Sequence, residues 1–437
     1  MARRDHVPKF ATGKTDSVPF GGLTLHRFRL DNGLELRVLP DSRAPIVSYQ
    51  SWFRVGSADE EPGRTGQAHF FEHLMFGATD TREEGELDRT FEAVGAEINA
   101  ATWTDWTYYY ETCPKRAWTR CVELESDRMV HLKLERERLL AERDVVLSER
   151  RSRVDDDVEG LAVEKLYALA LKGHAYAWPT LGWARDIRRF DLRASQAFYR
   201  RWYAPNNLTL VVAGDVSPAD VLRRVQKAYG SIPASKLPRR AARRTPAQRK
   251  QRRTTLSFVT PTPKFAIGYR APAFGSPDWA LLSVVCDILF GSRGARFPRS
   301  LVHERELCVS ARAHVTPFRD GGLFDVWLSL REDVEPANVL ELFDRELTRF
   351  LDEGPTPAEL TRAQNSLEFS FLTSMETIAG KAEQIGFYES VLGDATRVFD
   401  RLEAYQSASV ESVRDVARRY LDSTQRSVVE VVPKVGA

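Results

Sequence analysis

The second half of this 437-residue chain repeats a pattern found in the first half, and this repeat limits the possible folds most strongly. Residues 287–291 (DILFG) resemble residues 73–77 (HLMFG) and follow them by 214 positions. Residues 418–420 (RRY) similarly echo residues 201–203 (RWY) at 217 positions. A nearly constant offset indicates a duplicated unit, and a chain of this length is too long for one hydrophobic core. We therefore expect two homologous tandem domains.

Each copy mixes strand and helix patterns. Alternating apolar and polar residues from His26 to Pro40, interrupted by Asp-Asn-Gly, predict a β-hairpin. Further strands are expected at 47–55, 97–102, 106–112 and 208–213, and helices at 63–75, 84–94, 114–151 and 218–229. The predicted fold class is α+β, with each domain a mostly antiparallel β-sheet packed with helices. The expected divisions are an N-terminal arm (1–20), a first α+β domain (21–234), a basic linker (235–253) and a second α+β repeat (254–437).

The charge balance excludes a bulk electrostatic role. Lys and Arg number 63 against 61 Asp and Glu, a net charge of +2, so neither nucleic acid nor an anionic membrane is an expected partner. The basic linker has no interleaved aromatic residues to stack on bases. No stretch approaches eighteen uncharged apolar residues, so no membrane span is expected. We expect a soluble protein, and the sequence leaves open a cytoplasmic location or a periplasmic one with its signal removed.

Residues 69–73 (HFFEH) carry the strongest chemical signal in the chain. Two histidines four apart on a helix project from one face about 6 Å apart, and two imidazoles at that separation can share a metal ion. With Glu72 before the second histidine, the order is His-x-x-Glu-His, the reverse of the commoner zinc peptidase motif. Histidine pairs at this spacing also occur by chance. A charged Glu72 among Phe70 and Phe71 would be costly to bury without a role, which favours a metal site.

A catalytic zinc site needs a third protein ligand from elsewhere in the fold. Residues 134–151 have a strongly helical pattern, and within them Glu142 and Glu149 lie seven positions apart. Seven residues are two helical turns, so the two carboxylates share one face.

The motif, followed 76 positions after His73 by Glu149, resembles the pitrilysin/insulinase family of inverted-motif zinc metallopeptidases, which includes the mitochondrial processing peptidase. Further similar landmarks are residues 99–102 (NAAT), 174–176 (HAY) and 198–215, and the resemblance spans about residues 25 to 235, continuing more weakly to the end. It implies a zinc-dependent endopeptidase that binds one Zn²⁺ per chain. The implied ligands are His69, His73 and Glu149, with Glu72 as the general base and Glu142 orienting a ligand or holding the charge of the site.

The second copy lacks these groups. At the repeat offset, His69 falls on Ser283, Glu72 on Cys286 and His73 on Asp287, so this copy cannot bind zinc in the same way. In the family the metal-free repeat carries an arginine and, seven residues later, a tyrosine that reach the substrate. The corresponding positions here are Val302 and Val309. Valine has no hydrogen-bond donor, and losing one such donor can cost ~3 kcal/mol of transition-state stabilisation.

This difference implies a heterodimer in which a homologous subunit supplies the arginine and tyrosine. Three alternatives remain open. An arginine of the second copy replaces the missing donor locally, the chain is a self-sufficient homodimeric peptidase, or it is a noncatalytic scaffold subunit of a complex. The arginines considered for the first alternative are Arg296, Arg299 and Arg305.

The expected substrate is an extended peptide. Enzymes of this kind can add a peptide to an exposed strand edge, and the candidate edge is residues 98–102, with Asn99, Ala100 and Thr102 as substrate-binding residues. The alternative is that Asn99 caps a turn. The aromatic residues that follow, Trp103, Trp106 and Tyr108 to Tyr110, either line the substrate chamber or form core.

Overall fold

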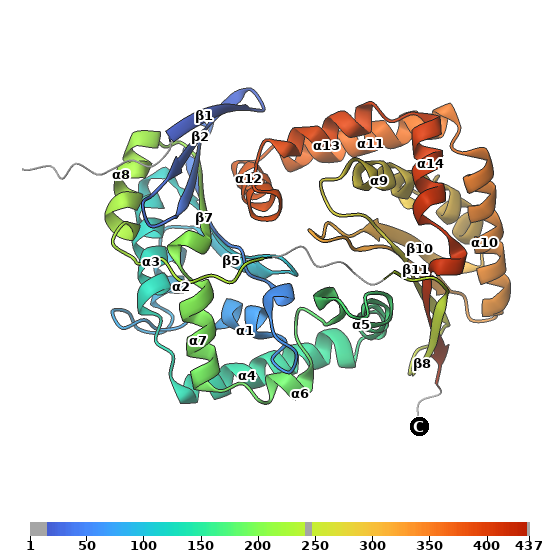
Figure 1. Ribbon diagram of the computed structural model, residues 1–437, viewed down its shortest axis with the longest axis horizontal. Helices are drawn as coiled ribbons and strands as arrows, with labels where there is room; N and C mark the ends of the chain where they lie inside the picture. The colour runs from blue at the N-terminus through green and yellow to red at the C-terminus, as the bar shows by residue number, and fades with distance from the viewer. Residues whose placement is uncertain (1–14, 241–246, 435–437) are drawn as a thin grey trace, which may run out of the picture.

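The computed structural model of the chain describes residues 15–240 and 247–434. Within these residues the strands form one seven-stranded and one five-stranded sheet, in two lobes (Figure 1). The first sheet contains β1 (Thr15–Phe20), β2 (Leu23–Arg29), β3 (Glu35–Pro40), β4 (Ile46–Phe53), β5 (Glu97–Thr102), β6 (Thr107–Pro114) and β7 (Leu208–Gly214). The second contains β8 (Arg252–Phe258), β9 (Lys264–Arg270), β10 (Cys308–Val315), β11 (Leu323–Leu330) and β12 (Ser427–Pro433).

The two sheets share one topology. The first sheet has the order β1-β2-β3-β7-β4-β6-β5 and the second β10-β11-β9-β12-β8. Read from β3 and from β8, both run through one parallel pair, β3 with β7 and β8 with β12, followed by antiparallel neighbours. The predicted α+β fold of two tandem copies, each mostly antiparallel, is confirmed. The β1–β2 hairpin is an addition to the first copy.

Helices surround both sheets. Those of the first lobe are α1 (Gln67–Leu74), α2 (Glu86–Glu92), α3 (Trp118–His131), α4 (Arg136–Arg150), α6 (Ala184–Ile187), α7 (Leu192–Trp202) and α8 (Pro218–Tyr229). Those of the second are α9 (Pro277–Phe290), α10 (Pro336–Glu353), α11 (Pro357–Ser374), α13 (Arg397–Gln406) and α14 (Val410–Tyr420). Two π-helical turns, η3 (Arg151–Asp155) and η6 (Pro298–Glu304), follow α4 and α9. Short 3₁₀ turns are η1 (Ser57–Asp59), η2 (Lys115–Ala117), η4 (Ala175–Ala177), η5 (Pro205–Asn207) and η7 (Ser423–Gln425).

One helix from each half packs on the sheet of the other half. Helix α12 (Ile378–Leu392), from the second half, covers β4 and β7 of the first sheet (Figure 1). A buried ion pair fixes this contact, since Arg37 Nε lies 2.6 Å from Glu389 Oε1. Gly386 permits the close approach, because a Cβ atom there would lie 2.0 Å from Trp52 Nε1. The first lobe is therefore incomplete without a helix encoded after residue 377.

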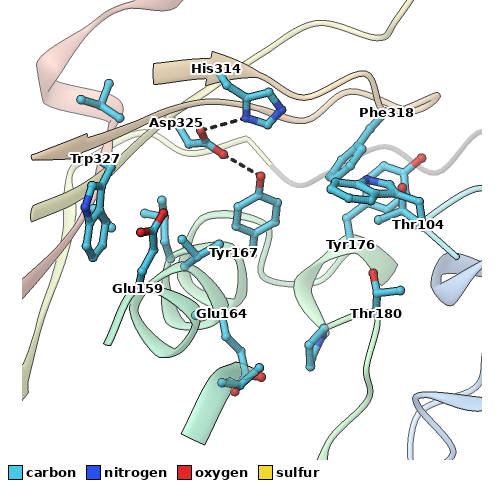
Figure 2. Close-up of a pocket in the computed structure, with 18 of the residues that line it drawn as sticks. Thr104, Glu159, Glu164, Tyr167, Tyr176, Thr180, His314, Phe318, Asp325 and Trp327 are labelled. Atoms are coloured by element: carbon cyan, nitrogen blue, oxygen red, sulfur yellow. Dashed lines mark hydrogen bonds and ion pairs between the residues drawn. The ribbon is translucent and has the colours of Figure 1, made fainter. Parts of the chain in front are cut away.

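The reciprocal contact is made by α5 (Val158–Ala170), which packs against β9 and β12 of the second sheet. Its Tyr167 hydroxyl donates a hydrogen bond of 2.7 Å to Asp325 on β11 (Figure 2). Helices α5 and α12 begin 220 positions apart, close to the repeat offset, so they are equivalent elements of the two copies. The duplicated units exchange their equivalent helices.

The continuous apolar run in β7 follows from this exchange. Leu208, Leu210 and Val212 pack with the helices of the first lobe, whereas Val211 and Ala213 belong to the cluster that includes α12. Alternate side chains of a strand point to opposite faces of its sheet. Because both faces of β7 are covered, the whole strand is buried, and Thr209 is its one polar side chain.

The expected N-terminal arm differs from the structure. Residues 1–14 lie outside the described residues, but Thr15–Phe20 forms β1 and pairs antiparallel with β2. The pairing is possible because Gly21 and Gly22 turn the chain with φ of 55° and 81°. This strand was missed because it is short and its pattern is polar, with only Phe20 fully buried among residues 16–20.

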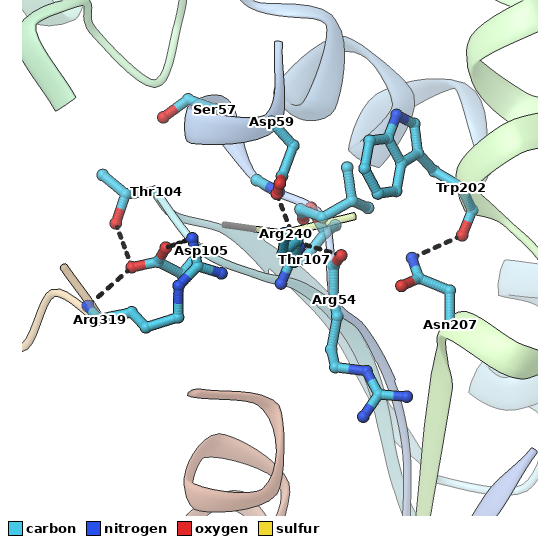
Figure 3. Close-up of polar contacts among 12 residues, drawn as sticks. Arg54, Ser57, Asp59, Thr104, Asp105, Thr107, Trp202, Asn207, Arg240 and Arg319 are labelled. Atoms are coloured by element: carbon cyan, nitrogen blue, oxygen red, sulfur yellow. Dashed lines mark hydrogen bonds and ion pairs between the residues drawn. The ribbon is translucent and has the colours of Figure 1, made fainter. Parts of the chain in front are cut away.

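The expected linker also ends earlier than predicted. Residues 235–240 and 247–251 have no regular structure, but β8 already begins at Arg252. The described part of the linker is anchored, because Arg240 donates to the Arg54 carbonyl and to the Asp59 carboxylate (Figure 3). Nearby, Asp105 accepts the Arg319 backbone N–H of the second lobe at 3.1 Å.

Candidate metal centre

Helix α1 presents the motif on one face. Its residues Phe70, Phe71 and Leu74 are at most 1% exposed and enter the hydrophobic core. At 3.6 residues per turn, this burial leaves His69, Glu72 and His73 on another face of the same helix. The short helix thus needs no apolar residue on the face that carries the chemistry.

The start of α1 is held by a carboxylate that the sequence analysis did not identify. Glu60 is 4% exposed and accepts the backbone N–H groups of Gly66 and Ala68 at 2.7 and 2.8 Å. These donors belong to the first turn of the helix and have no partner within it. Gly66 has φ of 95° and leaves no room for a side chain, because a Cβ atom would lie 2.6 Å from the Leu181 carbonyl oxygen. The position of α1 is therefore strongly determined.

Helix α4 brings the predicted carboxylates to α1. Glu149 Oε2 lies 3.2 Å from His73 Nε2 and 3.5 Å from His69 Nε2. Glu142 Oε1 lies 2.9 Å from His73 Nδ1. The heptad spacing of the two glutamates, which predicts a shared helix face, agrees with these contacts.

The end of α4 is tied to the start of α1 through one loop. The buried Arg150 side chain donates to the Gly182 carbonyl at 2.8 Å and to Glu164 at 2.7 Å. Residues 181 and 182 are those that pack closely against Gly66. These contacts, which we call the Arg150 clamp, fix Glu149 relative to the two histidines. Of the residues involved, only Gly66 and Gly182 gave any sign of this close packing in the sequence.

The three side chains fit a tetrahedral metal ion. Their ligand atoms all lie within 4.8 Å of one another, and within residues 15–240 and 247–434 no other group of three or more His, Cys, Asp or Glu side chains does so. Zinc bonds of about 2 Å at tetrahedral angles place ligand atoms about 3.3 Å apart. Glu149 Oε1 lies 3.1 Å from Arg153, while the buried Oε2 atom faces the Nε2 atoms of His73 and His69 at 3.2 and 3.5 Å. A carboxylate oxygen facing two imidazole nitrogens fits a bound cation.

The environment prepares the ligands for metal binding. Burial lowers the pKa of His69 to about 4, so this imidazole is neutral at pH 7. Burial also opposes the charged form of His73, but hydrogen bonds to Glu142 and Glu149 outweigh it and raise its pKa to about 9 in the metal-free protein. The hydrogen bond with His73 lowers the pKa of both glutamates, so they are ionised at neutral pH. Glu142 thereby holds the Nδ1–H of His73 and leaves its Nε2 free for a metal.

Glu72 lies on the same face of α1 as the two histidines. Burial raises the pKa of Glu72, and the nearby Thr102 hydroxyl only partly offsets this effect. Its Oε2 atom is buried without a hydrogen-bond partner. A carboxylate with a pKa moved toward neutrality is suited to accept and return a proton.

The candidate substrate edge lies beside the metal centre. Strand β5 is the last strand of the first sheet, and α1 packs against it. The Asn99 side chain accepts the backbone N–H of Ala100 at 2.8 Å, and Thr102 lies near Glu72. A cavity of about 410 Å³ adjoins this edge, lined by Glu72, His73, Phe76, Glu84, Gly85, Asp88, Asn99, Arg138 and Glu142. Of the aromatic residues that follow this edge, Tyr109 is fully buried in the core, whereas Trp103 is 44% exposed.

The second copy has a hydrogen bond where the first has the metal centre. Ser366, 217 positions after Glu149, donates to Asp287, the counterpart of His73, at 2.9 Å. The three arginines considered as replacement donors are engaged in the second half: Arg296 with Glu359, Arg299 with Glu304 and Arg305 with Glu346. Val309 is 63% exposed on β10.

Comparison with known proteins agrees with this geometry. The family model described as "Insulinase (Peptidase family M16)" matches residues 38–183, and the one described as "Peptidase M16 inactive domain" matches residues 189–367. The chain belongs to the M16 (insulinase) peptidase family. The resemblance inferred from the motif is confirmed, and the second match agrees with a metal-free second copy.

Relatives of this M16 chain match over nearly its whole length. It is 27% identical to "Zinc protease PqqE" of Helicobacter pylori, covering 92% of both proteins. It is also 27% identical to "Mitochondrial-processing peptidase subunit beta" of Lentinula edodes, covering 90% of this chain and 86% of that protein. Peptidase activity and zinc dependence are therefore properties of the family.

Solved structures share the fold. A protease from Helicobacter pylori matches with a TM-score of 0.88 and 25% identity, covering 96% of this chain and all of that one. A putative M16-like peptidase from Alicyclobacillus acidocaldarius matches with a TM-score of 0.81 at 20% identity, covering 96% of this chain and 100% of that one. Within residues 15–240 and 247–434, no helix has the length and apolar character required to cross a bilayer.

Proposed function

We propose that this protein is a zinc-dependent endopeptidase that hydrolyses extended peptides. The observation that carries the proposal is the convergence of His69, His73 and Glu149 around one point. Glu72 lies on the same face of α1 as the two histidines. One Zn²⁺ per chain would be held by the first three residues. A zinc ion in such a site supplies Lewis acidity and lowers the pKa of a water toward ~7.

The residues of the chain perform the remaining tasks. Glu72 takes the proton from the attacking water and returns it to the leaving amine, which its raised pKa favours. Glu142 holds the imidazole of His73 in the required tautomer. Residues Asn99, Ala100 and Thr102 of β5 align the peptide, because an edge strand offers unpaired backbone groups to an added strand.

The proposal includes a second, homologous subunit. Val302 and Val309 occupy the positions at which the family resemblance implies an arginine and a tyrosine, and they cannot donate a hydrogen bond to a developing oxyanion. The arginines near them are paired with carboxylates. A partner that carries the two donors would complete the site, and removing one donor can cost ~3 kcal/mol, or about a hundredfold in rate.

Two variants test the catalytic assignment. Glu72→Gln is expected to keep stoichiometric zinc, measured by metal analysis, and to lose hydrolysis of a quenched fluorescent peptide. His73→Ala is expected to lose both zinc and hydrolysis. A Glu72→Gln protein that cleaves at the wild-type rate would refute the role of Glu72, and a wild-type chain without zinc affinity would favour a noncatalytic scaffold.

Assaying the purified chain alone tests the shared site. Activity that appears only when the homologous subunit is added supports the heterodimer. Full activity of the isolated chain would remove the need for a partner and indicate a self-sufficient homodimer or monomer.

A further inference from the structure

A second cavity lies between the two lobes, and it is distinct from the cavity beside β5 that Glu72, His73 and Glu142 line. Its volume is about 410 Å³, within the range of small-ligand pockets. Helix α5 and the η4 turn, both from the first half of the chain, form one wall, and β9 to β11 of the second sheet form the other. Figure 2 shows Tyr167 rising from α5 toward Asp325, with Trp327 to one side and Phe318 to the other. The apolar walls are made chiefly by Val163, Leu166, Tyr176, Phe318, Val326 and Trp327.

Two residues that line this interlobe cavity follow closely after residues of the proposed active site. Trp103 lines it and follows directly after Thr102, the last residue of the edge strand and a neighbour of Glu72. Val154 also lines it and belongs to the π-helical turn that begins two residues after Glu149. A peptide bound along β5 and continuing past Thr102 therefore runs toward the cavity wall that Trp103 forms.

The carboxylates around the interlobe cavity are already paired. Asp325 accepts from Tyr167 at 2.7 Å and lies 3.0 Å from His314 Nδ1. Glu164 is bound by Arg150 at 2.7 Å. Glu159 is bound by Arg312 in the same way. With its negative charges neutralised, the cavity offers apolar surface rather than an anionic site for a cationic side chain.

We propose that the interlobe cavity binds a large apolar or aromatic side chain of the peptide substrate, on the N-terminal side of the cleaved bond. This inference rests on the proposed peptidase function and adds a substrate preference to it. The direction follows from strand pairing, because antiparallel pairs are the more stable and the more common. In a peptide antiparallel to β5, the residues that precede the one opposite Thr102 lie beyond it, toward Trp103.

Binding is measured separately from cleavage. Zinc-loaded full-length Glu72→Gln protein is titrated with fluorescent peptides that carry Phe, Ala or Arg at each of several positions on both sides of a central bond. The wild-type protein is assayed for kcat/KM with the same series. We expect one position on the N-terminal side at which Phe improves binding and kcat/KM about 10–100-fold over Ala, with Arg no better than Ala.

Filling the cavity is expected to remove this preference. Val163→Trp on α5 and Thr180→Trp on the loop after η4 each place an indole in the cavity, so one can replace the other if either fails to fold. Lys165→Trp, on the solvent side of the same helix, is the matched control and should retain the preference.

The outcomes separate the two proposals. Equal binding of all peptides, no binding, a preference for Arg, a preference on the C-terminal side, or a preference that survives both cavity-filling variants overturns the cavity assignment. A binding preference for Phe that persists while the wild-type protein cleaves no peptide, with and without a partner subunit, would instead refute the peptidase and leave the cavity as a peptide-binding site.

Discussion

Replacing Glu142 should weaken zinc binding although Glu142 is not among the three proposed ligands. Its carboxylate lies 2.9 Å from His73 Nδ1, and this hydrogen bond lowers its pKa. Partners of this kind typically change metal affinity about 10–100-fold, which is about 1.4–2.8 kcal/mol. Glu142→Gln keeps an acceptor for the imidazole N–H but removes the charge, so we expect a loss of about tenfold. Glu142→Ala removes both, and its loss should approach a hundredfold.

The assay is competition for Zn²⁺ against a chromophoric chelator at fixed pH. Glu137→Ala is the matched control, because Glu137 is an exposed glutamate in the first turn of the same helix. Its affinity should equal that of the wild type. An unchanged affinity for Glu142→Ala would refute the orienting role. A loss as large as that of His73→Ala would show that Glu142 is itself a ligand.

Three further predictions concern the lobe contacts and the second copy. Gly386→Ala should destabilise the protein by about 1–3 kcal/mol in denaturant unfolding, because its Cβ would meet the Trp52 ring, 2.0 Å from Nε1. Glu389→Ala should cost about 1.5–3 kcal/mol, because buried Arg37 loses its Glu389 partner and keeps Glu35, whereas replacing both Arg37 and Glu389 with methionine should cost less. Burial opposes the charge of Glu359, but an arginine hydrogen bond outweighs it and lowers its pKa to about 2, so its contribution is present above pH 4.5 and is lost as the pH falls toward 2. Glu359→Gln should therefore be about 1–3 kcal/mol less stable than wild type at pH 7 and nearly equal to it at pH 2; a difference that persists undiminished at pH 2 would contradict this.

The sequence predicted the structure best where a regular spacing of residues was sufficient evidence. The heptad between Glu142 and Glu149 implied one helix face, and both carboxylates do contact His73. The offset between the two halves implied a shared unit, and the two sheets have the same strand order. Strand β5 was a candidate edge from its residues, and it is the last strand of its sheet. These features depend on short-range geometry or on comparing the chain with itself.

Long-range partners could not be inferred in this way. Helical periodicity shows that α5 and α12 have apolar faces, but it does not say which sheet each face covers. The hydrogen bonds from Gly66 and Ala68 to Glu60 depend on a turn whose path the residue pattern does not specify. The interlobe cavity likewise has walls that lie far apart in the chain, such as Tyr167 and Asp325, which are 158 positions apart, so no local pattern could reveal it.

The helix exchange makes the metal centre depend on a lobe that contributes none of its three proposed ligands. Glu149 lies at the end of α4, and the chain continues through the π-helical turn directly into α5, which is packed on the second sheet. In the other direction, α12 covers the face of β4 and β7 opposite to the motif helix. A shift of one lobe would therefore strain the turn that follows Glu149, whereas the Arg150 clamp holds Glu149 itself against the first lobe. The second copy lacks the zinc-binding residues but supplies the sheet on which α5, the helix that follows this ligand, is packed.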